Sequence, residues 1–211
     1  MIVIIDYNAG NLTSVQRALY SLGIDSEITS DPDRVLQAER IIFPGVGASG
    51  KAMANLKQSG LDIAIKKAFG NGIPILGICL GTQIIMEHSE ENDCECLGLI
   101  KGRVIKFPDN LTDPYGKKLK IPHMGWNRVI LKRHHPLFTG IDTNSEFYFV
   151  HGYYPCPYDP KHTIGETDYG IRFVSVLGKS NLFAVQFHPE KSGRPGLRIL
   201  KNFSQWKGQT E

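Results

Sequence analysis

Residues 74–81 read Pro-Ile-Leu-Gly-Ile-Cys-Leu-Gly and lead an apolar run into Cys79, which stands between Gly77 and Gly81. The run predicts a buried strand, and the apolar residues from 81 to 87 predict the start of a buried helix. A cysteine flanked in this way is the thiol counterpart of the G-x-S-x-G nucleophile elbow. The glycines permit a strained turn, and the N-terminus of the following helix favours a thiolate. The alternative is a buried, inert cysteine, the usual state of a free thiol.

The elements around this run alternate between strands and helices. Apolar segments at 2–6 and 40–43 predict two further strands, the second ended by Pro44. Between the strands, residues 12–22 have helical periodicity, and 53–65 predict one or two more helices. Strands separated by helices indicate an α/β fold with an open, mainly parallel twisted sheet and helices on both faces.

The second half of the chain has a different pattern. Short strand-like segments occur at 102–107, 127–131, 146–150, 171–176 and 182–186. Turn residues separate them, which predicts antiparallel or mixed strands added to the sheet. A last helix is expected at about 196–206.

Composition limits the possible classes of protein. The chain has 211 residues, 41% of them hydrophobic and 21% charged, with a net charge of +3. We expect one globular domain, 1–211, and the small net charge does not indicate a nucleic-acid partner. No apolar run approaches the ~18 residues that cross a membrane, and the N-terminus does not resemble a secretory signal. The four cysteines are therefore expected to be free thiols in a cytoplasmic protein.

A second polar cluster lies far from the first in the sequence. In residues 185–190, Val-Gln-Phe-His-Pro-Glu, His188 and Glu190 follow an apolar strand at a spacing of two. Residues at i and i+2 of a strand point to the same side, so the carboxylate is expected to orient the imidazole. Parallel strands place their C-terminal ends on one edge of the sheet, which would bring His188 to Cys79. The sequence thus predicts a cysteine–histidine–glutamate triad, against the alternative of an exposed pair at the end of a strand.

Residues 45–50, Gly-Val-Gly-Ala-Ser-Gly, match the G-x-G-x-x-G pattern of dinucleotide sites. That fingerprint requires an acidic residue about 20 positions later, and residues 69–75 contain none. We therefore favour a loop whose backbone N–H groups stabilise an oxyanion beside Cys79.

Two further features are less specific. Cys94 and Cys96, with His88 nearby, lack the second ligand pair of a zinc site, so no metal is predicted. Trp126 lies between Gly125 and Asn127, where a core position and an aromatic interface anchor are equally compatible with the pattern.

These motifs resemble those of the class I, triad-type glutamine amidotransferases. The resemblance rests on residues 77–83 (Gly-Ile-Cys-Leu-Gly-Thr-Gln) and 186–190 (Gln-Phe-His-Pro-Glu). Within that class, other segments resemble the glutaminase subunits of imidazole glycerol phosphate synthases, which act in histidine biosynthesis. These segments are 6–12, 44–47, 122–127, 148–151 and 188–192.

The resemblance implies a role for each matching residue. Cys79 would attack the side-chain amide of L-glutamine and release ammonia through a glutamyl thioester, without a cofactor, while His188 transfers protons and Glu190 orients it. Backbone N–H groups of Gly47 and Leu80 would form the oxyanion hole. The substrate-binding positions implied are Gln83, Glu91, Gly152 and Tyr153. Ammonia would pass to a separate (β/α)8-barrel cyclase subunit, which Asn11 and Trp126 would face.

Two positions depart from the family pattern. Thr82 stands where methionine is common, and Gly152 stands where a serine or threonine usually follows the histidine. These departures keep open a paralogue that feeds ammonia to another synthase, for example in surface-sugar biosynthesis. Two hypotheses from other classes also remain, a stand-alone cysteine hydrolase and a nucleotide-binding module built on residues 45–50.

Overall fold

An eight-stranded sheet runs through the centre of the molecule in the order β2-β1-β3-β4-β14-β13-β12-β9. The computed structural model describes residues 1–209, so residues 210 and 211 of the predicted domain lie outside the described part. Strands β2, β1, β3, β4 and β14 are parallel, whereas β13, β12 and β9 continue the sheet in antiparallel pairs. The strands of this sheet are β1 (Ile2–Ile5), β2 (Ser26–Thr29), β3 (Arg40–Gly45), β4 (Ile75–Cys79), β9 (Ile130–Leu131), β12 (Thr163–Asp168), β13 (Arg172–Lys179) and β14 (Leu182–Val185).

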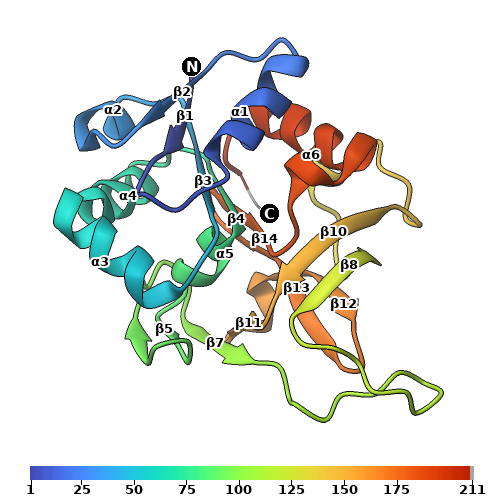
Figure 1. The fold of residues 1–211 in the computed structure, drawn as a ribbon. Helices are drawn as coiled ribbons and strands as arrows, with labels where there is room; N and C mark the ends of the chain where they lie inside the picture. The colour runs from blue at the N-terminus through green and yellow to red at the C-terminus, as the bar shows by residue number, and fades with distance from the viewer. Residues whose placement is uncertain (210–211) are drawn as a thin grey trace.

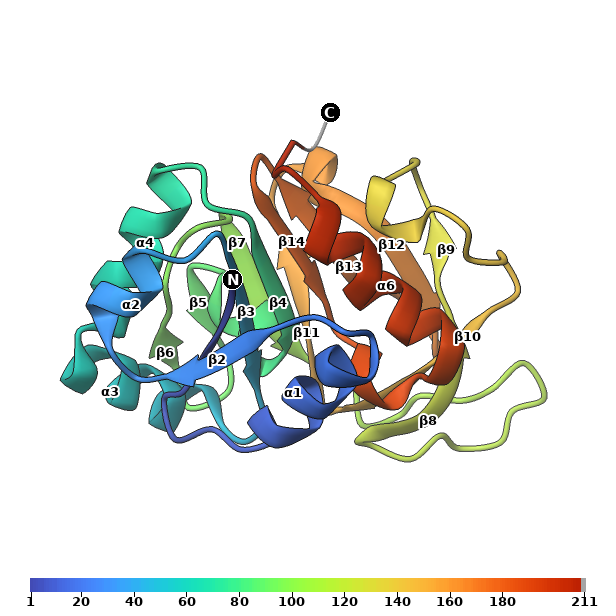
Figure 2. The same cartoon turned by 90° about the horizontal axis from the view of Figure 1, so that it is seen from above.

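Helices cover both faces of the sheet, as Figures 1 and 2 show. Strand β1 illustrates the division, because Ile2 and Ile4 pack into one hydrophobic cluster and Val3 and Ile5 into the other. This alternation follows from the two-residue repeat of a strand. Helices α1 (Leu12–Ser21) and α6 (Gly193–Gln205) contribute to the first cluster. The second cluster contains residues of α2 (Pro32–Leu36), α3 (Ser49–Ser59), α4 (Leu61–Gly70) and α5 (Leu80–Ile84). The predicted α/β fold with a mainly parallel sheet is confirmed.

The predicted strands at 102–107 and 146–150 lie in two smaller sheets instead of joining the large one. One pairs β8 (His123–Arg128) with β10 (Glu146–His151) as an antiparallel two-stranded sheet, the β8–β10 pair. The other has the order β11-β7-β5-β6. Its strands are β5 (His88–Ser89), β6 (Cys94–Glu95), β7 (Gly102–Lys106) and β11 (Tyr153–Pro157). Single 3-10 turns lie at η1 (Pro136–Phe138), η2 (Pro160–His162) and η3 (Pro189–Lys191).

The expectation that a strand ends at Pro44 is wrong, because β3 continues through Pro44 to Gly45. The missing N–H of a proline normally interrupts a central strand. Here the pairing of β3 with β1 ends at Ile42, whereas its pairing with β4 extends to Gly45. On the side of β3 that faces β1, Pro44 therefore has no paired residue. Its carbonyl instead accepts a hydrogen bond of 2.8 Å from the Tyr7 hydroxyl. Within residues 1–209, no helix has the length and apolarity needed to cross a membrane.

Candidate active site

Cys79 lies at the junction between β4 and α5, with φ 54° and ψ −107°. This positive φ, at a ψ outside the left-handed helical region, is strained for a residue with a side chain. The glycine that follows allows α5 to pack closely on β3, because a Cβ on Gly81 would stand 1.9 Å from the carbonyl oxygen of Phe43. The predicted elbow therefore forms, and it holds a buried cysteine that is 6% exposed.

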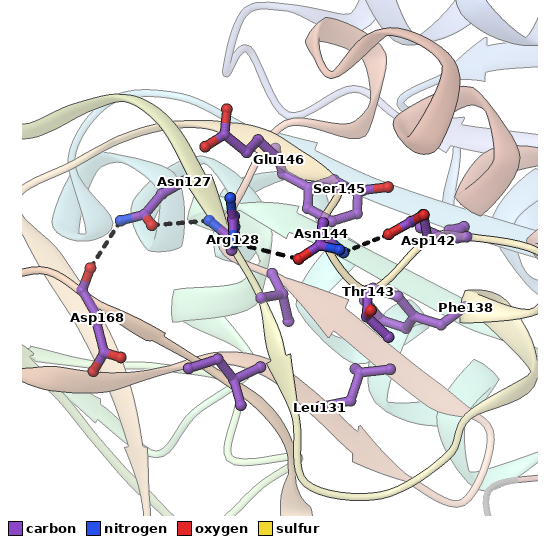
Figure 3. Close-up of a pocket in the computed structure, with 14 residues that line it drawn as sticks. Asn127, Arg128, Leu131, Phe138, Asp142, Thr143, Asn144, Ser145, Glu146 and Asp168 are labelled. Atoms are coloured by element: carbon purple, nitrogen blue, oxygen red, sulfur yellow. Dashed lines mark hydrogen bonds between the residues drawn. The ribbon is translucent and has the colours of Figure 1, made fainter.

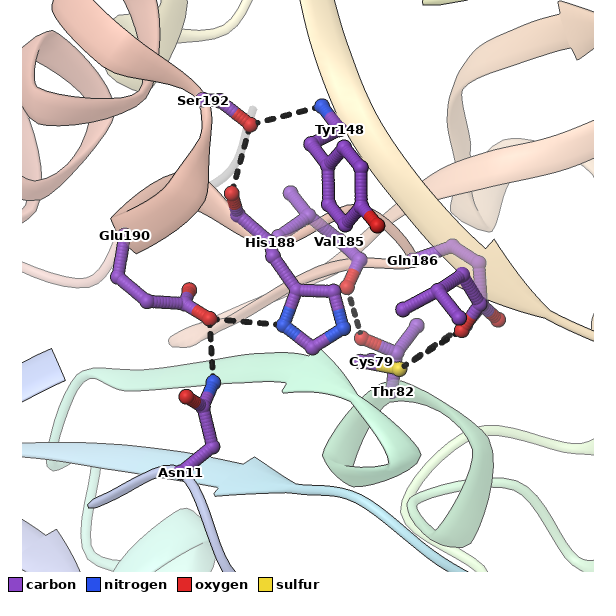
Figure 4. A network of polar contacts seen from close by, with 10 residues as sticks. Asn11, Cys79, Thr82, Tyr148, Val185, Gln186, His188, Glu190 and Ser192 are labelled. Atoms are coloured by element: carbon purple, nitrogen blue, oxygen red, sulfur yellow. Dashed lines mark hydrogen bonds and ion pairs between the residues drawn. The ribbon is translucent and has the colours of Figure 1, made fainter. Parts of the chain in front are cut away.

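His188 reaches the same edge of the sheet from the neighbouring strand. Strands β4 and β14 are parallel, with Ile78 opposite Val185, so the residues after both strands emerge together. The imidazole is fully buried, and its Nδ1 lies 2.7 Å from Oε1 of Glu190, which is itself buried (Figure 4). The two polar clusters, far apart in the sequence, thus lie at one edge of the sheet, where Cys79 and Glu190 both act on the pKa of His188.

The electrostatics of the triad favour a charged imidazole. Burial alone would lower the pKa of His188, but Cys79 and Glu190 outweigh it and raise the pKa to about 10. An opposite charge within a few ångströms stabilises the charged form of a histidine. Nε2 of His188 has no hydrogen-bond partner among the described residues, so it is available to transfer a proton. The site therefore favours a charged imidazole at His188.

Further hydrogen bonds hold the histidine and its carboxylate, and Figure 4 shows those made by Asn11 and Ser192. Asn11 Nδ2 donates to Oε1 of Glu190, the same oxygen that faces the imidazole. The hydroxyl of Ser192 donates to the carbonyl of His188 at 2.6 Å and accepts the N–H of Tyr148 at 2.9 Å. The N–H of His188 in turn donates to the carbonyl of Tyr148. The triad is therefore tied to β10 and to the start of α1.

One predicted substrate-binding residue, Gln83, is linked to the Cys79 sulfur through Gln186. The Gln83 amide donates to the carbonyl of Tyr153 at 2.9 Å and to Oε1 of Gln186 at 3.1 Å. Gln186 then directs its own amide at the Cys79 sulfur, at 3.7 Å. Sequence reasoning did not select Gln186, although a glutamine that follows the apolar run 182–185 is a usable signal of a buried polar role. Gly152 stands between β10 and β11, and its carbonyl accepts from the N–H of Phe107.

The predicted oxyanion residues, Gly47 and Leu80, follow the ends of the neighbouring strands β3 and β4. Leu80 opens α5, and Gly47 (φ 108°) follows β3, in which Gly45 is opposite Cys79. Glu91 occupies a neighbouring place: its carboxylate accepts the N–H and the hydroxyl of Ser49 at 2.8 and 3.0 Å. The carboxylate thus fills the position at the start of α3 where a dinucleotide phosphate would bind.

The two departures from the family pattern have different structural effects. The Thr82 hydroxyl donates to the carbonyl of Val185 at 2.6 Å and so links α5 to β14, the strand that precedes His188. Gly152 has no steric need to be glycine, because a Cβ there would meet only Ile121, at 3.8 Å. Within residues 1–209, no group of three or more histidine, cysteine, aspartate or glutamate residues could hold a metal ion.

Trp126 lies on β8 of the β8–β10 pair and is 54% exposed. Its ring contacts Tyr148 edge-on, with 5.9 Å between the ring centroids, and Met124 beside it on β8 is also exposed. Of the two interpretations of Trp126, the core position is excluded. Asn11 is half-buried and bonded to Glu190, a contact that its predicted partner-facing role did not include.

Comparison with known proteins assigns the family. Residues 3–206 match the family described as glutamine amidotransferase class-I. A protein of Maridesulfovibrio salexigens named imidazole glycerol phosphate synthase subunit HisH is 52% identical over 206 residues, covering 98% of this chain and 97% of the relative. The protein of the same name from Neisseria gonorrhoeae is 47% identical over 209 residues, covering 96% of this chain and 98% of its own.

Solved structures agree on the fold. One described as a glutamine amidotransferase superimposes with a TM-score of 0.72 at 16% identity, covering 97% of this chain and all of the other. A chain of PurLQS from Thermotoga maritima has a TM-score of 0.72 at 19% identity and covers 97% of both chains. The chain therefore belongs to the class-I glutamine amidotransferase family and, within it, to the HisH subunits of imidazole glycerol phosphate synthase.

Proposed function

We propose that Cys79, His188 and Glu190 hydrolyse the side-chain amide of L-glutamine. Membership of the HisH family makes the chain the glutaminase subunit of imidazole glycerol phosphate synthase in histidine biosynthesis. The observation that carries the catalytic assignment is the buried His188, bonded to Glu190 at 2.7 Å and held beside the Cys79 sulfur.

The proposed reaction proceeds through a thioester. The Cys79 thiolate attacks the amide carbon of glutamine, and the carbonyl oxygen becomes an oxyanion. The tetrahedral intermediate collapses, the C–N bond breaks, and His188 Nε2 gives its proton to the departing ammonia. Water then attacks the thioester while His188 accepts a proton from it. Breakage of the C–S bond releases glutamate and restores the thiolate–imidazolium pair.

Backbone groups on either side of the sulfur would stabilise the oxyanion. The N–H groups of Leu80 and Gly47 are proposed as its donors, and loss of one such donor typically costs 10²–10³ in rate. Gln83 and the backbone at Gly152 and Tyr153 would hold the amino-acid end of the substrate. Glu91 would act with them by fixing the loop that carries Gly47, since its carboxylate binds Ser49.

The acceptor of the ammonia is a second subunit in this proposal. Free ammonia at neutral pH is mostly ammonium, a poor nucleophile, so a glutaminase benefits from a docked synthase. We propose a (β/α)8-barrel cyclase that contacts the exposed Trp126 and the surface near Asn11. We also propose that residues 1–211 form one domain that acts in the cytoplasm.

Replacement of the nucleophile tests the catalytic assignment. Cys79→Ala in complex with the cyclase subunit should lose glutamine-dependent synthesis while synthesis from added ammonium salt remains. Glutamate production at the wild-type rate would contradict the role of Cys79. Full glutaminase activity of the isolated wild-type chain, with no stimulation by the cyclase and its ligand, would instead favour a stand-alone hydrolase. Stimulation by a different synthase would identify a paralogue.

A further inference from the structure

Two buried histidines outside the triad are joined directly to each other. His123 on β8 and His151 on β10 are opposite each other in the β8–β10 pair, and His123 Nδ1 lies 3.0 Å from His151 Nε2. Their side chains are 2% and 5% exposed. Nδ1 of His151 lies 2.8 Å from the carbonyl oxygen of Tyr153, the same oxygen that accepts the Gln83 amide. The pair therefore ends on a group that holds a proposed substrate-binding residue.

The hydrogen bonds determine where each ring carries its proton. A carbonyl only accepts, so Nδ1 of His151 must carry a proton and donate to Tyr153. In a neutral His151 the other nitrogen, Nε2, is then an acceptor, which requires a proton on Nδ1 of His123. Nε2 of His123 is left as an acceptor, and the Asn127 amide stands 3.4 Å from it as the donor. The hydrogen bonds that run from Asn127 through His123 and His151 to the carbonyl of Tyr153 form a series, and each of them donates toward Tyr153.

Burial keeps both rings neutral, as this arrangement requires. It lowers the pKa of His123 to about 4 and the pKa of His151 to about 3, the latter helped by the neighbouring His123. A second proton on His151 would place two N–H groups against each other across the 3.0 Å contact. The series therefore has one stable protonation pattern.

The series begins at the edge of a cavity of about 570 Å³. There the Asn127 amide also donates to the carbonyl of Asp168 at 2.9 Å, and its oxygen accepts the N–H of Arg128, as Figure 3 shows. Asn127 is thus held in the orientation that presents its amide to His123. At the other end, Gln83 leads through Gln186 to the sulfur of Cys79.

We propose that the hydrogen-bonded pair His123–His151 is a positioning device that fixes the carbonyl of Tyr153, and through it Gln83, for binding of glutamine. The inference rests on the proposed function, since it deepens the role given to Gln83 and Tyr153. Neither histidine is a catalytic residue. The competing explanation is packing alone, because the ring of His123 stacks on Tyr169 at 4.0 Å and on Phe149 at 4.9 Å.

Two substitutions at His123 separate these explanations. His123→Phe keeps a ring in the stack but removes both nitrogens and leaves His151 Nε2 without its donor. His123→Asn loses the ring but keeps an amide N–H close to the position of Nδ1. Loss of one buried hydrogen bond corresponds to about a tenfold change in binding. We therefore expect His123→Phe to raise the KM for glutamine about tenfold in the complex with the cyclase, with a smaller change in kcat, and His123→Asn to remain within about threefold of the wild type.

His135→Phe is the matched control. His135 is also buried, stacks on Phe183 at 4.3 Å and has a pKa lowered to about 4 by burial, but it lies at η1, outside the series. Its substitution should leave the KM unchanged. A wild-type KM in His123→Phe, or a larger rise in His123→Asn than in His123→Phe, would overturn the proposal in favour of packing.

Spectroscopy of the unmodified protein provides an independent test that does not depend on a variant that folds. Nitrogen-15 NMR of histidine-labelled chain in the complex at pH 7 should show neutral His123 and His151, each with its proton on Nδ1. A proton on Nε2 of either ring, or a charged ring, would refute the pair. Absence of glutaminase activity in the wild-type complex would instead count against the proposed function, whatever the spectra show.

Discussion

Exchange of Glu190 for glutamine tests how the triad carboxylate is held. Oε1 of Glu190 faces two donors, Nδ1 of His188 at 2.7 Å and Nδ2 of Asn11. Oε2 is buried without a hydrogen-bond partner among the described residues. In Glu190→Gln the amide oxygen should therefore take the place of Oε1, and the amide nitrogen the place of Oε2. Both hydrogen bonds are kept, and only the charge is lost.

The size of the effect follows from that orientation. A hydrogen bond to a charged group contributes ~1.5–3 kcal/mol, against ~0.5–1.5 kcal/mol for a neutral one. The imidazolium of His188 should thus lose about 1–2 kcal/mol, or roughly 5- to 30-fold in kcat/KM. An amide that flipped would donate to His188 and select the wrong tautomer, which costs ~10⁴ in serine protease triads. Asn11 opposes this flip because its amide would then face another donor.

The assay is the glutaminase rate of the complex with saturating cyclase, measured between pH 6 and 10.5. Glu190→Gln should lose roughly 5- to 30-fold, and its alkaline limb should move to lower pH because the carboxylate contributes to the raised pKa of His188. Asn11→Ala alone should lose only a few-fold, whereas the double variant should fall toward ~10⁴ because the flip is no longer opposed. A 10⁴-fold loss in Glu190→Gln alone, or a double variant no worse than the product of the singles, would refute the reasoning.

Two other substitutions test the elbow and the buried histidines. Gly81→Ala places a Cβ 1.9 Å from the Phe43 carbonyl and should move α5, with a loss of about 1–3 kcal/mol in denaturant unfolding and a large loss of glutaminase rate; an unchanged midpoint would contradict the close packing. His135 has a folded-state pKa lowered to about 4, so its contribution to stability is present above pH 6.5 and is lost as the pH falls from 6.5 toward 4. Wild type should therefore lose about 2–3 kcal/mol more than His135→Phe between pH 6.5 and 4.5 in urea titrations; parallel curves would show that His135 does not titrate in this way.

The sequence predicts the triad because local patterns determine its position. Apolar runs identify β4 and β14, and parallel strands end at the same edge of a sheet. Cys79 and His188 can therefore be predicted to lie at one edge before any distance between them is known. The helix and strand bounds agree for the same reason wherever the periodicity is strong, as in α1 and β1. Strand β2 was not predicted, since the segment Ser26–Thr29 at the sheet edge is only half-buried and contains no apolar run.

Contacts between distant parts of the chain were beyond such patterns. The bond from Asn11 to Glu190 joins residues 179 positions apart, and an asparagine before a helix predicts only a cap. The continuation of β3 through Pro44 depends on which neighbouring strand ends first. Likewise, strand patterns for β8 and β10 do not indicate whether these strands join the large sheet or pair with each other. These outcomes depend on tertiary packing, which a single sequence does not encode in any local window.

The β8–β10 pair contacts both the proposed catalytic groups and the proposed substrate-binding groups. Trp126 contacts Tyr148, whose backbone N–H binds Ser192 and whose carbonyl accepts the N–H of His188. Three residues further along the same strand, His151 binds the carbonyl of Tyr153. The register of β10 against β8 is fixed, because a shift by one residue would break the whole ladder of hydrogen bonds between the two strands. A displacement of β10 caused by a contact at Trp126 would therefore reach His188 through Tyr148 and the Tyr153 carbonyl through His151.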